Sequence, residues 1–153
     1  FPYPSDLTIL ENMEHFLDPV PEKYRTDLKT EIERYVCENW NRDRLNLRIK
    51  KLRDWNQYYG NGLLKIWCAE FGCYQNPINA EFGGYQETIK NADRARYITD
   101  IRGVFEENKI GWAYWSYNET FSVMTVDRTP FGPAGEQKPD TGILKALMPD
   151  KFQ

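Results

Sequence analysis

The chain has 153 residues, the size of one ordinary domain, and 41% of them are apolar, enough to form a core. The net charge of −3 argues against a nucleic-acid partner, because phosphate binding needs clustered positive charge. No apolar run reaches the roughly 18 residues that a membrane span requires. His15 is the single histidine, and Cys37, Cys68 and Cys73 lack zinc-ligand spacing, so the sequence indicates neither a metal nor a cofactor.

Helices dominate the first part of the chain. The proline-rich residues 1–21 predict an extended arm with at most one short helical turn. A helix is predicted from residue 21 to about 39, and a second from about 42 to 59, where Gly60-Asn61-Gly62 ends it. Four apolar residues with helical spacing mark one face of the second helix: Leu45, Ile49, Leu52 and Trp55.

A short apolar run from Leu63 to Ala69 ends in the carboxylate of Glu70, and Gly72 follows two residues later. Runs of this length, bounded by turn residues, are typical of strands buried on both faces. A carboxylate there is costly to bury unpaired, but it is well placed if the strand end opens into a polar site, as in α/β barrels. Glu70 is thus the first candidate for a functional residue. The alternative is a glutamate that caps a helix or forms an ordinary ion pair.

The remaining elements alternate in the same way: a long loop over 75–91, a helix from about 92 to 108, a second buried strand over 110–117, a loop rich in proline and glycine over 118–139, and a helix capped by Asp140 that runs through Met148. Strands that alternate with helices imply a parallel sheet. Two parallel strands can neither close a barrel nor bury both faces. The sequence therefore predicts an α/β fold that is incomplete on its own.

Aromatic residues are unusually frequent, at 15% of the chain. They either fill the core or form flat platforms on which sugars or bases stack. Trp112 and Trp115 differ by three on one strand, so we expect them to face opposite sides. The same spacing separates Trp67 from Glu70 and predicts that Trp67 faces helices. Two tryptophans in the helical region are assigned to the core: Trp40 and Trp55.

Four segments, in their order and spacing, resemble the C-terminal part of the catalytic domains of glycoside hydrolase family 5, the cellulase and mannanase family. They are Ala69-Glu70-Phe71-Gly72, the following helix with Arg94 and Tyr97, Ile110-Gly111-Trp112-Ala113-Tyr114-Trp115-Ser116-Tyr117, and Asp140-Thr141-Gly142-Ile143-Leu144-Lys145-Ala146-Leu147. Phe1-Pro2-Tyr3-Pro4-Ser5-Asp6 resembles the loop after the sixth strand of cellulase-like members. The resemblance implies the last two to three βα units of a (β/α)8 TIM barrel. Residues 1–153 would form a partial catalytic domain, and the arm over 1–21 would follow the sixth strand.

The resemblance also implies roles for individual residues. Glu70 matches the family's nucleophile at the end of the seventh strand. Trp115, on the eighth strand, matches the tryptophan that lies under the sugar at the cleavage point. The family's acid/base glutamate closes the fourth strand, which this chain lacks, and Asn118-Glu119 is not assigned that role. Three residues just past strand ends either line sugar subsites or pack as ordinary loop residues: Tyr74, Asn118 and Phe121.

The implied function is that of a retaining β-glycosidase, first of all an endo-β-1,4-glucanase that cleaves β-1,4-glucan by double displacement between two carboxylates. The N-terminal half of the barrel, in the same or a separate chain, is then a required partner. A related β-mannanase or other β-glycanase is one alternative, a non-catalytic carbohydrate-binding or pseudoenzyme half-barrel is another, and a small doubly wound binding domain is the least favoured. The expected ligand is a β-linked polysaccharide or oligosaccharide, with no nucleic acid or membrane, and the family resemblance implies a secreted or periplasmic location.

Overall fold

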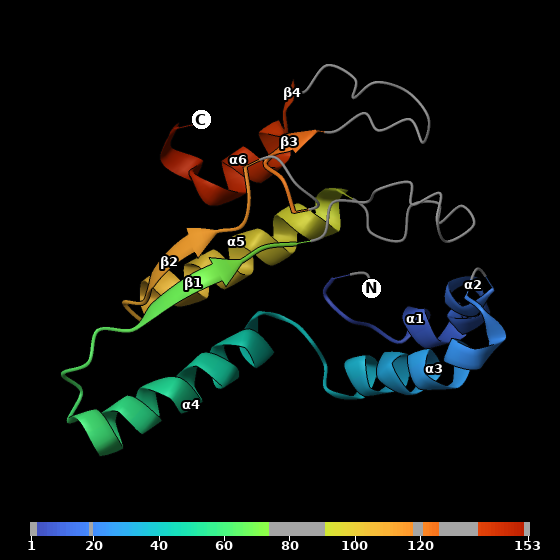
Figure 1. Ribbon diagram of the computed structural model, residues 1–153, viewed down its shortest axis with the longest axis horizontal. Helices are drawn as coiled ribbons and strands as arrows, with labels where there is room; N and C mark the ends of the chain where they lie inside the picture. The colour runs from blue at the N-terminus through green and yellow to red at the C-terminus, as the bar shows by residue number, and fades with distance from the viewer. Residues whose placement is uncertain (1–2, 19, 74–90, 118–120, 126–137, 152–153) are drawn as a thin grey trace.

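The computed structural model of the chain describes residues 3–18, 20–73, 91–117, 121–125 and 138–151. Two parallel strands lie against a long helix, and a group of helices near the N-terminus forms a separate layer (Figure 1). Among the described helices, none has both the length and the apolar character that a bilayer crossing requires.

The N-terminal layer consists of α1 (Thr8–Glu11), α2 (Met13–Leu17) and α3 (Glu22–Cys37). These helices share a hydrophobic cluster of their own, centred on Ile9, Leu17, Ile32 and Val36. The prediction of an extended arm over residues 1–21 is wrong between Thr8 and Leu17. The prolines of this region lie at positions 2, 4, 19 and 21, so they flank the two short helices and do not interrupt them.

The two long helices, α4 (Arg42–Gly60) and α5 (Asn91–Glu107), confirm the predicted helical segments. The side chain of Asn41 caps α4, because it accepts a hydrogen bond of 3.0 Å from the backbone N–H of Arg44. Asn61, with φ 50°, and Gly62, with φ 70°, turn the chain into the left-handed region and end the helix where the sequence predicts it.

The inward face of α4 is narrower than its apolar spacing predicts. Leu45 and Asn56 are buried, whereas Leu52 is 39% and Trp55 is 50% exposed. The assignment of Trp55 to the core is therefore wrong. Asn56 takes the inward position because its side-chain amide both donates to and accepts from the backbone of Leu64, at 2.9 and 3.3 Å, and so fastens the chain that leaves the helix.

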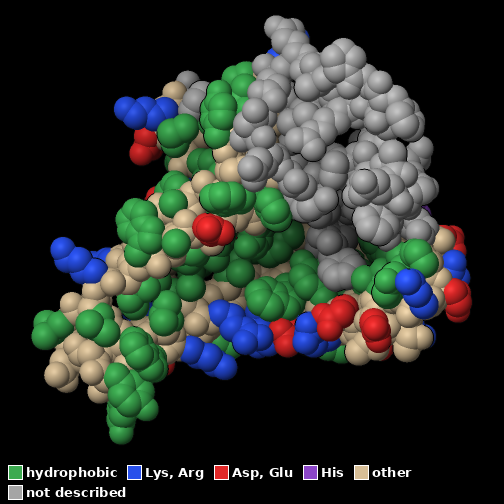
Figure 2. Space-filling model, viewed as in Figure 1, with side chains coloured by type: hydrophobic (Ala, Val, Ile, Leu, Met, Phe, Trp, Pro, Cys, Tyr) green, Lys and Arg blue, Asp and Glu red, His purple; other side chains and the backbone are tan. Residues whose placement is uncertain are grey.

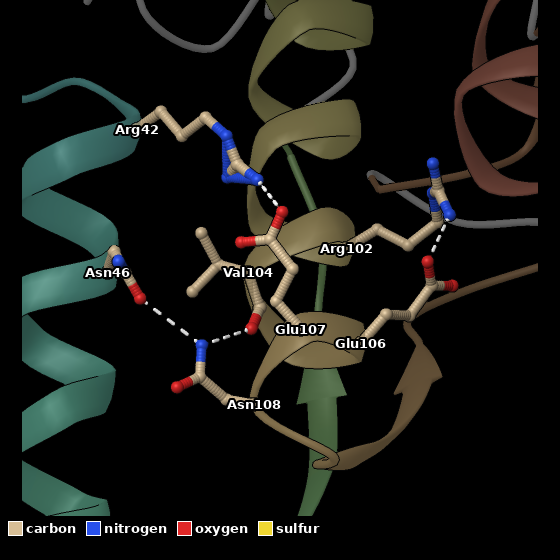
Figure 3. Close-up of polar contacts among 7 residues, drawn as sticks. All are labelled: Arg42, Asn46, Arg102, Val104, Glu106, Glu107 and Asn108. Atoms are coloured by element: carbon tan, nitrogen blue, oxygen red, sulfur yellow. Dashed lines mark hydrogen bonds and ion pairs between the residues drawn. The ribbon is translucent and has the colours of Figure 1, made fainter.

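Polar contacts join α4 to α5 (Figure 3). The Arg42 guanidinium donates to the Glu107 carboxylate. The Asn108 side chain donates to Asn46 Oδ1 at 3.2 Å and to the Val104 carbonyl oxygen at 2.7 Å. These groups lie near the surface, where a single ion pair contributes at most about 1 kcal/mol. They orient α4 and α5 relative to each other, and the apolar core provides most of the attraction between the two helices.

Strands β1 (Trp67–Phe71) and β2 (Gly111–Tyr114) form the parallel pair that the alternation of strands and helices predicts. Cys68 pairs with Trp112 and Phe71 with Tyr114, so β1 has one more residue than β2 between these two pairs. This is a β-bulge at residues 69–70. Both strands are shorter than predicted. The prediction that both faces of the sheet are buried is also wrong for the described residues, because only the face toward α5 is covered.

The main core lies between this sheet face and the helices α5 and α6 (Thr141–Leu147). Asp140 caps α6 as predicted, because its side chain accepts a hydrogen bond of 3.1 Å from the backbone N–H of Ile143. A short antiparallel pair, β3 (Met124–Thr125) and β4 (Lys138–Pro139), precedes α6, and a 3-10 turn, η2 (Pro149–Lys151), follows it. Strands of two residues leave no periodic pattern, so the sequence does not predict them. The half-buried Trp40 packs against this core, as predicted, and four α5 residues are buried in it: Ile98, Ile101, Val104 and Phe105.

Buried tyrosines predict a loss of stability at alkaline pH. Burial raises the pKa of Tyr97 from 10.0 to about 12, and it also raises the pKa of Tyr3 and Tyr114. A group whose pKa is higher in the folded state stabilises the fold fully below its unfolded pKa, and this contribution disappears as the pH rises through the folded value. We expect the free energy of unfolding to fall from about pH 10 to pH 12, measured by urea titrations followed by circular dichroism. In the variant Tyr97→Phe the free energy of unfolding should fall less steeply. A free energy of unfolding of the parent that stays constant to pH 12 would contradict the raised tyrosine pKa values.

Candidate functional site

Glu70 lies one residue before the end of β1 and is exposed. The next residue, Phe71, is only 8% exposed, and its ring packs edge-on against three others, with centroid distances of 5.3 Å to Phe105, 5.5 Å to Trp112 and 5.5 Å to Tyr114. Phe71 thus anchors the strand on the α5 side. Glu70 is left on the opposite, open side of the sheet.

The β-bulge decides this orientation. In a regular strand Glu70 would share the α5 side with the half-buried Cys68, two residues earlier. The extra residue instead leaves Ala69 and Glu70 both exposed before Phe71 turns inward. Trp67 is 64% exposed, and its ring covers Gly111, where an added Cβ would lie 2.1 Å from Trp67 Cε3. The prediction that Trp67 faces helices, opposite to Glu70, is wrong because spacing arguments assume an unbroken pleat.

Glu70 has neither of the ordinary structural roles among the residues that the structure describes. It forms no ion pair there and caps none of the helices. Its backbone carbonyl accepts a hydrogen bond of 3.3 Å from the thiol of Cys68. Cys68 and Cys73 are both free and half-buried, so no disulfide braces this strand end.

Trp115 directly follows β2, at the same end of the strand pair as Glu70. Along β2, Trp112 and Tyr114 pack toward Phe71 on the α5 side, whereas Trp115 is 46% exposed. The predicted opposite orientation of Trp112 and Trp115 is confirmed. The backbone N–H of Trp115 donates to the Phe71 carbonyl oxygen at 2.8 Å, so the two strands remain in contact at this end. The peptide bond between Trp115 and Ser116 is cis.

Gly72 allows the two strand ends to meet. A Cβ at this position would lie 2.3 Å from the Trp115 carbonyl oxygen and 3.2 Å from the Cβ of Phe121. The half-buried Phe121 therefore lies over the strand end, beside the backbone that carries Glu70. The structure thus gathers three of the predicted site residues around Gly72: Glu70, Trp115 and Phe121. Tyr74 and Asn118, together with the predicted loop over 75–91, lie outside the described residues.

A buried arginine supports the strand ends from the α5 side. Arg94 of α5 is 0% exposed, and it donates to Asp140 Oδ2 and to the Ser122 carbonyl oxygen, each at 3.2 Å. Burial raises the pKa of the Cys73 thiol and of the Tyr114 phenol, and the nearby Arg94 cation opposes both shifts. In sequence Arg94 is one of several arginines in a helix, and only its position in the family resemblance marks it.

Helix α3 borders the outer edge of the same region. Burial raises the pKa of Tyr35 to about 12, and the proximity of Cys73 and Asp93 adds to the rise. Tyr35 stacks in parallel on Trp40, with centroids 6.4 Å apart. The arrowheads of β1 and β2 point toward the end of the molecule that holds α1–α3 (Figure 1). Helix α3 therefore approaches the chain where it leaves the carboxyl end of β1, near Cys73.

The described residues contain no group of three His, Cys, Asp or Glu side chains that could hold a metal ion. The site presents one exposed carboxylate near the end of β1, an exposed indole just after β2, and a second aromatic side chain over Gly72. A carboxylate so placed can act as a nucleophile or a base, and aromatic faces suit the flat, apolar sides of sugar rings.

Comparisons with known proteins point to the same class of fold. The chain is similar to Thermotoga maritima Cel5A in complex with cellobiose, with a TM-score of 0.50 and 17% identity over 69% of this chain and 27% of that one. It is similar to the cellulose synthase subunit Z of Clostridioides difficile, with a TM-score of 0.49 and 21% identity over 70% and 28%. A β-xylosidase from Phanerodontia chrysosporium is 29% identical over 89 residues, which are 57% of this chain and 17% of that protein. No family model matches the chain.

The Cel5A match supports the mixed α/β fold and nothing finer. Solved endoglucanase structures align with about 70% of this chain, yet the chain spans less than a third of each of the proteins named above.

Gly72→Ala tests the contact at the strand ends. The new methyl group would overlap the Trp115 carbonyl oxygen, which is backbone and cannot swing aside, so we expect a loss of about 1–3 kcal/mol in the free energy of unfolding. Gly103→Ala in α5 is the matched control, because its Cβ would lie 3.5 Å from the nearest atom, Arg42 Nη2, and alanine in a helix interior gains about 0.5–1 kcal/mol over glycine. Urea titrations of both variants measure the change. An unchanged free energy of unfolding in Gly72→Ala would show that the strand ends do not meet as described.

Proposed function

We propose that this chain is the C-terminal portion of a retaining β-glycosidase of the cellulase type, an endo-β-1,4-glucanase of glycoside hydrolase family 5. It contributes the last two to three βα units of a (β/α)8 barrel. One observation carries the proposal: Glu70 stands exposed and unpaired among the described residues at the carboxyl end of a parallel strand, and the exposed Trp115 follows the neighbouring strand at the same end. The carboxyl ends of parallel strands are where barrel enzymes hold their catalytic groups.

In this mechanism Glu70 is the nucleophile. Its ionised carboxylate attacks the anomeric carbon and forms a covalent glycosyl–enzyme intermediate, while a second carboxyl group protonates the leaving oxygen and then activates water. The two groups need a separation of about 5–5.5 Å across the scissile bond. The rigid end of β1, fixed by Phe71 and by the bulge, supports the first role.

Aromatic side chains provide the sugar platform. Trp115 offers an exposed indole at the same strand ends as Glu70, and Phe121 lies over Gly72 there. Tyr74 and Asn118 extend the proposed subsites. The similarity to a β-xylosidase supports a β-linked glycan as the proposed substrate. A β-mannanase or another β-glycanase shares this chemistry and differs in the loops around it.

The N-terminal half of the barrel is the proposed partner, from the same or a separate chain. The exposed apolar surface supports it: Leu63 is 83%, Trp67 64% and Leu64 50% exposed. These residues line a pocket of about 600 Å³ between the end of α4 and the starts of β1 and β2. Figure 2 shows hydrophobic side chains spread over α4 and the strands on this side. Additional strands would cover this surface and supply the acid/base carboxyl.

Glu70→Gln tests the catalytic role in the complete enzyme, that is, this chain joined to the preceding half of the barrel. Removal of the nucleophilic charge should lower kcat on carboxymethylcellulose on the order of a thousandfold or more, with little change in melting temperature, because the side chain is exposed. Glu33→Gln in α3, also exposed, is the matched control and should keep full activity. Full turnover by the Glu70→Gln variant would rule out the proposed nucleophile.

A non-catalytic carbohydrate-binding half-barrel is the second candidate, favoured by the exposed indoles of Trp55, Trp67 and Trp115. Titration calorimetry separates the two: a binding module takes up cello-oligosaccharides as the isolated chain. The catalytic proposal expects binding and hydrolysis only from the complete barrel.

The isolated chain should self-associate. Its open sheet face and the apolar surface around Trp67 need a cover, and a second copy of the chain is the only one available in a pure sample. We expect light scattering to report dimers or larger species, and the double variant Leu63→Lys with Trp67→Lys to shift the distribution toward the monomer. A monodisperse, cooperatively unfolding parent chain would argue against an incomplete barrel.

A further inference from the structure

The fully buried guanidinium of Arg94 has no direct place in the proposed chemistry. Arginine is almost never fully buried unless it is paired, since desolvation of its charge costs several kcal/mol. Arg94 is 0% exposed, and its only ion pair among the described residues is with Asp140, itself 8% exposed. A buried pair of this kind adds little net stability over an apolar replacement, so its value lies in the geometry that it imposes.

Two hydrogen-bond partners of Arg94, Asp140 and Ser122, hold the segment that follows β2. Its Nη1 donates to Asp140 and its Nη2 to the carbonyl oxygen of Ser122. The backbone N–H of Asp140 donates to the Val123 carbonyl at 2.8 Å, and the Ser122 hydroxyl accepts from the backbone N–H of Met124 at 2.8 Å. The guanidinium therefore fastens this segment at Ser122 and, through Asp140, at Val123.

The same segment carries the proposed sugar platform. Phe121 directly precedes Ser122 and lies over Gly72, and the backbone N–H of Val123 donates to the Ser116 carbonyl at 3.1 Å, one residue after Trp115. A shift of Ser122 would move Phe121 directly, and it would move Trp115 through Ser116. Glu70 would move less, because the packing of Phe71 on Phe105 of α5 also anchors β1.

We infer that Arg94 is a positioning residue that sets where Trp115 and Phe121 stand relative to Glu70, and so determines how tightly the sugar chain is held. This inference rests on the proposed function. Arg94 lies on the α5 side of the sheet and does not touch substrate. Lysine cannot replace it, because a single ammonium group lacks the rigid fork that reaches two partners in different directions.

Arg94→Lys in the complete enzyme tests the inference, with Arg102→Lys as the matched control. Arg102 lies on the same helix and also joins α5 to α6, since its Nε donates to the Ala146 carbonyl at 2.8 Å, but it does not contact the segment after β2. We expect Arg94→Lys to raise KM for cello-oligosaccharides roughly tenfold, the scale of one lost hydrogen bond to a charged group, with kcat on an activated aryl cellobioside within about threefold of the parent. Arg102→Lys should leave both values unchanged.

A second readout does not depend on activity. Amide hydrogen exchange should accelerate at Val123 and Met124 in Arg94→Lys and stay at the parental rate there in Arg102→Lys. Equal exchange in the two variants, or a KM that Arg94→Lys leaves unchanged, overturns the positioning role. If the parent enzyme cleaves no glycan, the proposed function fails, and the exchange rates still decide whether Arg94 positions this segment.

Discussion

The packing of Phe71 is the constraint on which the rest of the structure depends. Its ring is the point where β1, β2 and α5 meet, in edge-on contact with Phe105, Trp112 and Tyr114. With Phe71 buried, the residue before it must turn the other way. The β-bulge supplies the extra residue that makes this possible without loss of the Cys68–Trp112 pairing below it. The burial of Phe71 thus explains why the acidic side chain of Glu70, one residue earlier, is exposed.

The second strand completes the arrangement through close backbone contact. Gly72 has no side chain to separate it from the Trp115 carbonyl, and the hydrogen bond from Trp115 to Phe71 holds the strand ends at van der Waals distance. The candidate site residues are therefore sequence neighbours of core residues: Glu70 precedes Phe71, and Trp115 follows Tyr114. Core packing on one side of the sheet and the candidate chemistry on the other are consequences of the same alternation.

The sequence predicts the features that depend on local signals. The turn at Asn61 marks the end of α4, Asp140 marks the start of α6, and the apolar periodicity of α5 marks that helix. The alternation of strands with helices predicts the parallel pair. The bulge cannot be predicted because an inserted strand residue leaves no mark in the composition. For the same reason the side of the sheet on which Trp67 lies is predicted wrongly. Trp55 is wrongly assigned to the core because helical spacing does not show which of two adjacent faces of α4 packs against the rest of the protein. Helices as short as α1 and α2 are stabilised by contact with α3, which no local pattern contains.

The uncovered side of the sheet and the proposed chemistry both require additional strands. The carboxyl ends of β1 and β2 bring Glu70 and Trp115 to the same end of the strand pair. A retaining mechanism needs its second carboxyl across the scissile bond, facing Glu70 from the far side of the sugar. Neither strand of the described pair can reach that position, because both deliver their side chains from the same edge. Under the proposed function the missing strands must therefore both cover the apolar surface around Trp67 and carry the acid/base group, whereas a binding module would need only the cover.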